Sequence, residues 1–595
     1  MAQSHTTTDF GAQLNVLRGS PQDTRLDLLS DQFFNGFDEV AFDVHDARMF
    51  FDDPSPRGSY ADDELRQSPN WMASASTKIQ LDEPDGLHPQ LLGYSADMDP
   101  YLLQHYHFDA SGSFRFKQLT IQSASLGSAP TQFLLSQPEQ FSFSRQEMGL
   151  SEHSHSLQRE ELETFVSADT GARLISLFCR FILPQYPIFS DSALPSPRGS
   201  PPHLLAALYM VAQPFARFDD ALSIELAYEG LNTQALFKFI TQALLYESHD
   251  PDMSTVQTLV LLVLRPSSNP LILESSVKWS LHGQLVSVSH TLGLHYDPSA
   301  WTIAPWKIAL RRRLSTTIFT LDKWLACSLG RPPLIGRAAW LVTSVTNADG
   351  HESGLDLLTW SRHICTVQLG SLLGDVLENL YALRAVANMA NDINATLDIS
   401  RRLLEELSSW YEQYQLLSPA ESAETTSLFT VFILGYHYVK MTIFRAIIRP
   451  AVSNHYSSSD TIGTTNQSSN QSEIRGFARL GVRSSTSAAA DFVTNLKEEH
   501  VHMFWPHWSQ IAFSSICFLD LLMAVSSLST EEAVDWFGHL HMVRKQMRFK
   551  ANMLPVLRLG LLRIDAIYWK GVEKVIHLPP HVRDALQMST AAHAT

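Results

Sequence analysis

The amino-acid sequence predicts an all-α protein, a large multi-helix domain preceded by a disordered acidic N-terminal arm. Two features predict the helical domain. Apolar residues recur at helical spacing over most of the chain beyond residue 160, and no useful length of sequence alternates apolar and polar residues as a strand does. Composition predicts the arm, because the first 160 or so residues are rich in Ser, Gln, Asp, Pro and Gly without a sustained period. Hydrophobic residues are 45% of the 595, a globular content.

The stretch from Trp306 to Ile335 is predicted to contain one long helix, which ends before Gly330. Gly330 follows it as a left-handed C-cap, and the prolines at 332 and 333 cannot continue it. Asp322 lies at the rim of the apolar stripe, where a carboxylate is rarely left unpaired, and Arg331 is one candidate partner. The stripe consists of Leu310, Leu314, Ile318, Leu321, Leu325 and Leu329.

This stretch resembles the signature helix of the fungal-specific transcription factor domain, the regulatory middle region of fungal zinc-cluster transcription factors. The sequence departs from the family pattern at Ser315 and Thr316, where aromatic residues are usual. Upstream, residues 292–298 resemble a second family motif at the family's spacing, and the whole resemblance covers roughly residues 165–569. The matching signature residues are Arg311, Arg313, Leu321, Asp322, Lys323, Leu325, Gly330, Arg331, Pro332 and Pro333.

The resemblance implies a nuclear regulator of RNA polymerase II genes in a fungus, with a metabolic pathway or a biosynthetic gene cluster as an option for its target. The implied partners are a DNA-bound transcription factor and coactivators, with promoter DNA contacted indirectly. A helical domain of this size can also enclose a pocket for a small-molecule effector, although no residue of the sequence identifies one.

The zinc cluster that binds DNA in this family needs six cysteines, and the sequence does not supply them. Its four cysteines, Cys179, Cys327, Cys365 and Cys517, are far apart in apolar helical contexts. The net charge of −17 also argues against a broad basic face for nucleic acid. The sequence therefore indicates a co-regulator or a shortened zinc-cluster factor, with no cofactor, although the family would call for zinc.

Composition and helical spacing divide the chain into five predicted regions. The apolar run from Ile511 to Val525 is shorter than a membrane span and contains Asp520, so we expect a buried core helix and no membrane contact. The regions are a mostly disordered 1–160, the family's helical domain 161–450, a Ser/Asn-rich mobile loop 451–475, C-terminal helices 476–575 packing on the same domain, and a disordered tail 576–595.

An acidic-aromatic segment between Asp23 and Glu64 is a candidate activation segment. Acidic residues surround its aromatic side chains and keep them solvated, a composition associated with segments that fold onto coactivators. The alternatives are a plain disordered arm or an element docked on the main domain. The phenylalanines are Phe33, Phe34, Phe37, Phe42, Phe50 and Phe51.

The alternative function is an all-α enzyme or a small-molecule-binding protein without a DNA role. A diphosphate site with magnesium needs carboxylates one helical turn apart. Asp52-Asp53, Asp219-Asp220 with Glu225, and Asn391-Asp392 with Thr396 each lack the spacing or a ligand, so helix caps and solvated acids are the favoured interpretation. Hydrolase, metalloprotease and nucleotide-binding motifs do not occur. We therefore predict a protein that is not an enzyme.

Because no cysteines are paired in the sequence, the purified chain should hold no stoichiometric zinc. Metal analysis of protein dialysed against a zinc buffer should find well below one ion per chain. Two tightly held zinc ions would contradict the prediction.

Overall fold

The computed structural model describes residues 81–82, 87–125, 129–150, 155–228, 230–389, 392–417, 430–457 and 465–594. All of these belong to one compact unit that begins at Ser74. The phenylalanines of the candidate activation segment lie outside the described residues, so their role stays a prediction.

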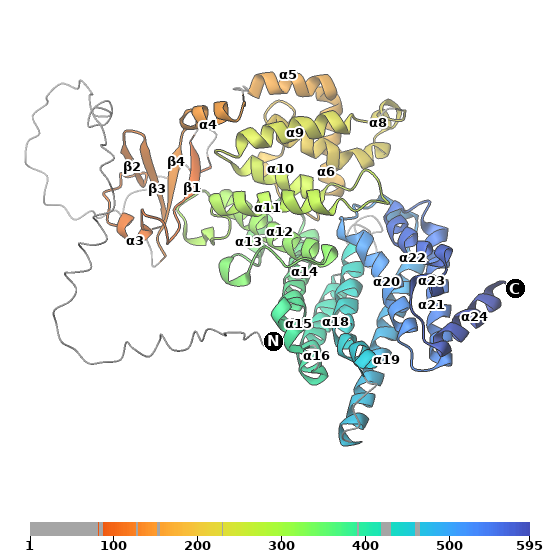
Figure 1. Ribbon diagram of the computed structural model, residues 1–595. Helices are drawn as coiled ribbons and strands as arrows, with labels where there is room; N and C mark the ends of the chain where they lie inside the picture. The colour runs from red at the N-terminus through yellow and green to blue at the C-terminus, as the bar shows by residue number, and fades with distance from the viewer. Residues whose placement is uncertain are drawn as a thin grey trace, which may run out of the picture. The chain divides into compact units, whose positions relative to one another are not determined.

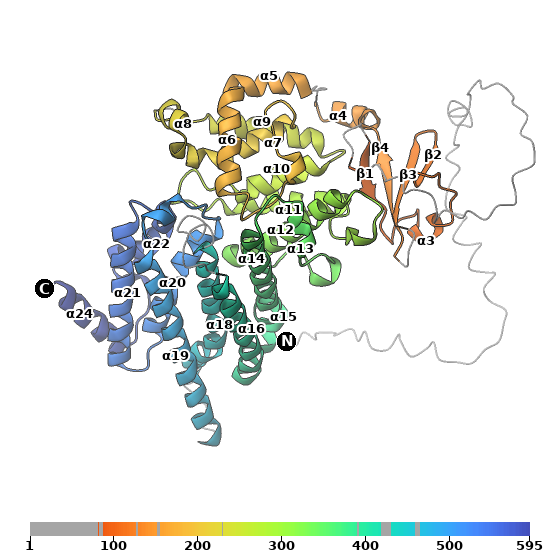
Figure 2. The same ribbon diagram turned by 180° about the vertical axis from the view of Figure 1, so that it is seen from behind.

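The described chain begins with a small antiparallel sheet in the strand order β1-β4-β3-β2 (Figure 2). Strands β2 and β3 are joined by a two-residue turn in which Lys117 has a positive φ of 53°. The pairing of β3 with β4 is irregular between Ser123 and Ser125. The strands are β1 (His88–Leu91), β2 (Ser113–Phe116), β3 (Leu119–Ser125) and β4 (Thr131–Ser136).

This sheet corrects the predicted disorder of residues 1–160 for the part of that region that the structure describes, which begins at residue 81. Polar side chains hide the strand pattern in the sequence, because Gln122 and Gln132 are buried in the sheet beside Phe133. The Gln122 amide donates to the backbone carbonyls of Ser111 and Gly112, so its burial leaves no donor unpaired. A short helix, α3 (Pro100–Leu103), lies between β1 and β2 in the chain, and another, α4 (Ser142–Glu147), follows β4.

Beyond the sheet the described chain is helical, which confirms the all-α prediction apart from the four strands. Figure 1 shows α12 between α11 and α14. The helices up to α12 are α5 (His155–Phe165), α6 (Ala168–Phe181), α7 (Pro202–Ala212), α8 (Asp220–Glu225), α9 (Thr233–Glu247), α10 (Met253–Leu264), α11 (Ser275–Thr291) and α12 (Pro305–Leu329). Those that follow are α13 (Asn347–His351), α14 (Leu357–Val376), α15 (Leu383–Met389), α16 (Ile393–Leu416), α18 (Thr430–Ser457), α19 (Thr465–Asn495), α20 (Trp508–Val525), α21 (Thr530–Lys550), α22 (Arg558–Lys570), α23 (Val572–Val575) and α24 (Pro580–Ala594).

Two large apolar cores meet at α12. The N-terminal core lies among α6, α7, α9, α10 and α11, and α12 contributes Leu314 and Ile318 to it. The C-terminal core lies among α14, α16 and α18–α22, and α12 contributes Trp324 and Cys327 to it. The Trp324 indole stacks on that of Trp508 with 4.3 Å between ring centroids. One helix therefore carries side chains of both cores.

The polar tract and the C-terminal tail differ from their predictions. Helix α18 extends to Ser457 and α19 begins at Thr465, so the described parts of the predicted mobile loop 451–475 are helical. The predicted tail 576–595 contains α24, which buries Val582, Ala585 and Leu586. Serine and threonine do not prevent a helix when it continues from a packed segment, because tertiary contacts outweigh weak propensities.

Among the residues that the structure describes, two helices are long and apolar enough to cross a membrane by length and composition alone. They are residues Thr430–Arg449 of α18 and the whole of α20, and 83% and 72% of these windows are buried inside the protein. Ile511 to Val525 is thus part of the C-terminal core, as the sequence predicts.

A buried carboxyl group at the end of α9 makes the fold sensitive to pH. Burial, together with the nearby carboxylates of Asp252 and Asp250, raises the pKa of Glu247 to about 8. Arg145 pairs with Asp250 and lies 3.9 Å from the ring of Tyr246, so Asp250 takes the ion pair there. Glu247 is therefore protonated in the folded protein at neutral pH.

The folded pKa of Glu247 lies above its unfolded value, so its contribution to stability is full below about pH 4.5 and is lost as the pH rises toward 8. Glu247→Gln, which cannot ionise, should be more stable than the parent at pH 8, by on the order of 1 kcal/mol or more, and should show a flatter stability profile. Urea unfolding at pH 5, 6.5 and 8 measures this, with the exposed Glu161→Gln as control. Parallel profiles for the parent and Glu247→Gln would contradict the assignment.

Candidate functional site

Helix α12 is buried around its whole circumference, not only along the predicted stripe. Every residue from Arg313 to Ser328 is buried. Two hydroxyl groups of its polar face are satisfied within the helix, because Thr316 and Thr320 donate to the carbonyls of Arg312 and Thr316 at 3.0 and 2.9 Å. The serine at a position that is usually aromatic accepts a hydrogen bond from the buried indole of Trp340, at 2.8 Å to Ser315 Oγ. The helix can therefore run through the interior without unpaired hydroxyl groups at these positions.

Arg311 connects the start of α12 to the sheet region. Its guanidinium makes two hydrogen bonds to the Asp82 carboxylate, at 2.8 and 2.7 Å, and a third to the carbonyl of Leu292. It also lies beside the rings of Phe133 and Trp301, at 5.8 and 5.1 Å from their centroids. A guanidinium held in this way serves the fold.

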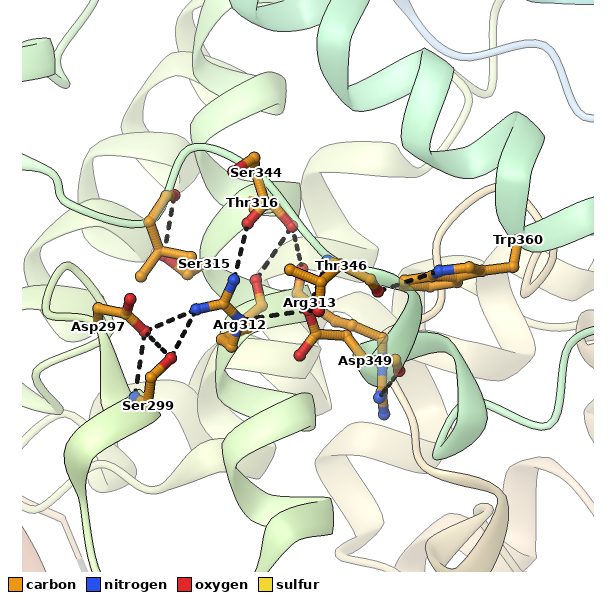
Figure 3. A network of polar contacts seen from close by, with 11 residues as sticks. Asp297, Ser299, Arg312, Arg313, Ser315, Thr316, Ser344, Thr346, Asp349 and Trp360 are labelled. Carbon is orange, nitrogen blue, oxygen red and sulfur yellow. Dashed lines mark hydrogen bonds and ion pairs between the residues drawn. The ribbon is translucent and has the colours of Figure 1, made fainter. Parts of the chain in front are cut away.

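Arg312 contacts carboxylates, whereas Arg313 donates to backbone carbonyls, and the two arginines share Asp349 (Figure 3). Arg312 contacts Asp297 at 2.7 Å and Asp349 at 3.2 Å. Arg313 is completely buried and donates to carbonyl groups, among them those of Pro187 at 3.0 Å and Asp349 at 2.9 Å. Burial lowers the pKa of Arg313 to about 10, so it stays cationic at neutral pH. The three arginines thus lie on different faces, as expected, and none of them is available to a phosphate.

Asp322 is completely buried and accepts four hydrogen bonds. The donors are His282 Nε2 at 2.9 Å, Lys323 Nζ at 2.8 Å, and the backbone N–H groups of Leu334 and Ile335 at 2.9 and 3.2 Å. Burial by itself would raise the pKa of Asp322, but the hydrogen bond from His282 and the Lys323 ammonium outweigh it and hold that pKa below its usual value. The carboxylate ties α11, α12 and the segment after α12 together.

The prediction that Arg331 pairs with Asp322 is wrong, because Arg331 does not contact it. Gly330 adopts the expected left-handed conformation, with φ 65° and ψ 38°, and ends the helix. After this reversal and the proline pair, backbone N–H groups face Asp322, and the Arg331 guanidinium lies 5.3 Å from the ring of Trp279. Sequence reasoning missed His282, although a histidine between the apolar Leu281 and Leu285 of a predicted helix was a signal for a buried polar partner.

The expected interpretation of the acidic pairs as helix caps holds for two of them. The Asp219 carboxylate accepts from the backbone N–H groups of Ala221 and Leu222 at the start of α8. Asp392 caps α16 through the N–H of Ala395. Asp52-Asp53 lies outside the described residues. Within the described ranges no group of three His, Cys, Asp or Glu side chains is arranged to hold a metal ion.

One cluster has the composition of a catalytic triad but not its arrangement. Ser254 Oγ donates to Asp252 at 2.7 Å and contacts His203 Nε2 at 3.2 Å. In a working triad the histidine lies between the serine and the carboxylate and accepts the serine proton. Here the serine lies between the other two, and Asp252 is the N-cap of α10. Burial also lowers the pKa of His203 to about 4, so this histidine is neutral at physiological pH.

Cavities suited to small molecules lie in the C-terminal half. One of about 820 Å³ is lined by α16, α18 and α19, with Leu404, Ile447 and Phe477 beside Arg401 and Glu405. Another of about 350 Å³ lies between α18, α20 and α22. Both volumes are in the range of ligand-binding pockets.

Replacing Asp322 should destabilise the protein far more than replacing its formerly expected partner. Asp322→Ala leaves Lys323 and two backbone N–H groups without their buried acceptor, so it should lower the free energy of unfolding by roughly 3–5 kcal/mol. Arg331→Ala removes a partly exposed contact with Trp279 and should cost less than about 1 kcal/mol. Chemical denaturation of both variants measures the difference, and equal losses would contradict the assigned roles.

Comparison with known proteins agrees with the signature helix. Residues 175–342 match the fungal specific transcription factor domain. An uncharacterized transcriptional regulatory protein of Schizosaccharomyces pombe is 23% identical over 442 residues, which are 72% of this chain and 61% of that protein. Transcriptional activator protein DAL81 of Saccharomyces cerevisiae is 23% identical over 416 residues, 61% of this chain and 40% of DAL81. No solved structure is significantly similar.

The chain thus spans only 61% and 40% of the length of these two relatives. Its match to the family includes α12 with the buried arginines and Asp322, as well as the turn that follows the helix. Residues 175–342 of the chain are thus similar to the fungal specific transcription factor domain.

Proposed function

We propose that the chain regulates RNA polymerase II transcription in a fungal nucleus as a co-regulator that a DNA-bound partner brings to promoters. The observation that carries the proposal is the family's domain, with its signature helix at the junction of the two cores. The printed names of the relatives, a transcriptional regulatory protein and a transcriptional activator, support the same role. A shortened DNA-binding factor is the second form of this proposal.

The charges of the described residues support indirect recruitment. Sequence-specific binding to DNA needs several phosphate contacts together with contacts to base edges. The three neighbouring arginines of α12 are engaged with Asp82, Asp297, Asp349 and backbone carbonyls, so they cannot provide such contacts. The net charge of −17 further disfavours attraction to a polyanion.

The described residues also support a role other than catalysis. The triad-like cluster caps α10, and two acidic pairs cap α8 and α16. Catalytic groups need a reactive atom that faces a substrate, whereas these side chains are turned onto the backbone. We infer that the domain works by contacts with partners and requires no cofactor, and that the acidic-aromatic segment recruits coactivators.

The purified chain should bind promoter DNA only weakly, and the binding should fall steeply with salt, because few phosphate contacts are available. The same chain fused to an unrelated DNA-binding domain should change transcription of a reporter that carries the fused domain's site. Gel-shift assays at physiological salt and reporter measurements in yeast test the two halves separately.

A fusion whose six phenylalanines between Phe33 and Phe51 are changed to serine should lose most of its effect. The control is a fusion with serine-to-alanine changes in the polar tract between residues 453 and 473. A discrete, competitor-resistant complex of the unfused chain with DNA would contradict indirect recruitment. A fusion that binds its site without altering the reporter would contradict the regulatory role.

A further inference from the structure

The cavity of about 350 Å³ between α18, α20 and α22 has a polar side and an apolar side. Its apolar lining follows α20, where Ile511, Phe518 and Leu522 recur at helical spacing over about 16 Å of helix. Its polar lining includes Arg445 of α18 and Arg563 of α22. A cavity with one polar and one apolar side suits an amphiphilic molecule, which has a charged part and an apolar part.

Neither arginine of the cavity has a counter-ion in the part of the chain that the structure describes. Arg445 is partly buried, and its hydrogen bond there goes from Nε to the Tyr381 hydroxyl at 3.3 Å. Arg563 is exposed and makes no ion pair with a described carboxylate. Other guanidinium groups of the protein are paired with carboxylates, as Arg311 and Arg544 are with Asp82 and Asp565. Two guanidinium groups that line one cavity without a carboxylate can bind an anion there.

The hydroxyl group of Ser514 lines the same cavity. Ser514 is 4% exposed, and its Oγ makes no hydrogen bond with any described residue. Its neighbours differ, since Thr442 and Ser515 donate to the carbonyls of Tyr438 and Ile511, each at 2.8 Å. Because the Ser514 hydroxyl lines the cavity, it can donate to a ligand atom bound there.

We propose that this cavity binds an amphiphilic carboxylate, with the carboxylate on Arg445, Arg563 and Ser514 and the apolar part along α20. Guanidinium groups bind carboxylates through charge-assisted hydrogen bonds, which are stronger than neutral ones. The apolar part gains burial against Ile511, Phe518 and Leu522. The bound molecule joins three helices of the C-terminal half, so it stabilises the folded state in proportion to its concentration. Binding does not depend on the proposed role in transcription.

Calorimetric titration of the full chain with octanoate tests the site. Octanoate should bind saturably at about one molecule per chain, and the neutral 1-octanol and the short acetate should each bind at least about tenfold more weakly. Arg563→Gln, at an exposed position where folding is not at risk, should weaken octanoate binding by about tenfold or more, and Arg445→Gln should do the same. Arg583→Gln, an exposed arginine of α24 outside the cavity, is the matched control.

Unchanged octanoate affinity in Arg563→Gln and in folded Arg445→Gln would overturn the proposal, as would equal affinity for octanol. Absence of saturable binding up to about millimolar octanoate would overturn it as well. The titration contains no DNA and no partner, so its failure would leave the proposed regulatory role standing, and failure of the reporter assay would leave the binding site standing.

Discussion

The buried carboxylate of Asp322 is the interaction on which the rest of the structure depends. It accepts hydrogen bonds from His282 of α11, from its neighbour Lys323, and from the backbone that follows the proline pair. These contacts fix the exit of α12, the helix that supplies both cores. A buried ion pair adds little net stability compared with an apolar replacement of the same shape, but a buried charge that loses its partners is costly. We infer that Asp322 mainly fixes one arrangement of the N-terminal and C-terminal cores and adds little to the stability of either core.

The family's signature residues therefore describe a way of building the domain. Arg311 forms an ion pair with Asp82 near the sheet, and Arg313 donates hydrogen bonds to backbone carbonyls of two segments. Gly330 ends the helix in the left-handed conformation. None of these groups is left to contact a ligand or nucleic acid. Function then falls to the surfaces, to the cavities of the C-terminal half, and to segments outside the described residues. This separation agrees with a regulator whose chemistry is binding and whose scaffold is internal.

Sequence reasoning predicted the long helix, its end and the all-α class, because a stripe of leucines followed by Gly and two prolines is a strong local signal. It missed the sheet, where Gln122 and Gln132 occupy buried positions and break the alternation of apolar and polar residues. It also chose Arg331 over His282, because a partner 40 residues away on another helix is invisible to local spacing. The lack of a described carboxylate partner for Arg445 and Arg563 could not be predicted either, because ion pairing depends on how the helices pack.

Native-state hydrogen exchange tests the central place of α12 most directly. Amides from Ile318 to Leu325 lie between the two cores and should exchange only through global unfolding, with protection equal to the full free energy of unfolding. The backbone N–H groups of Leu334 and Ile335 donate to the Asp322 carboxylate, so they should be as well protected as those of α12 although they lie beyond the helix. Peripheral helices such as α24 should exchange sooner through local opening. If α12 exchanged as early as α24, or if its two halves opened separately with the N-terminal and C-terminal cores, the account of α12 as the shared element would be wrong.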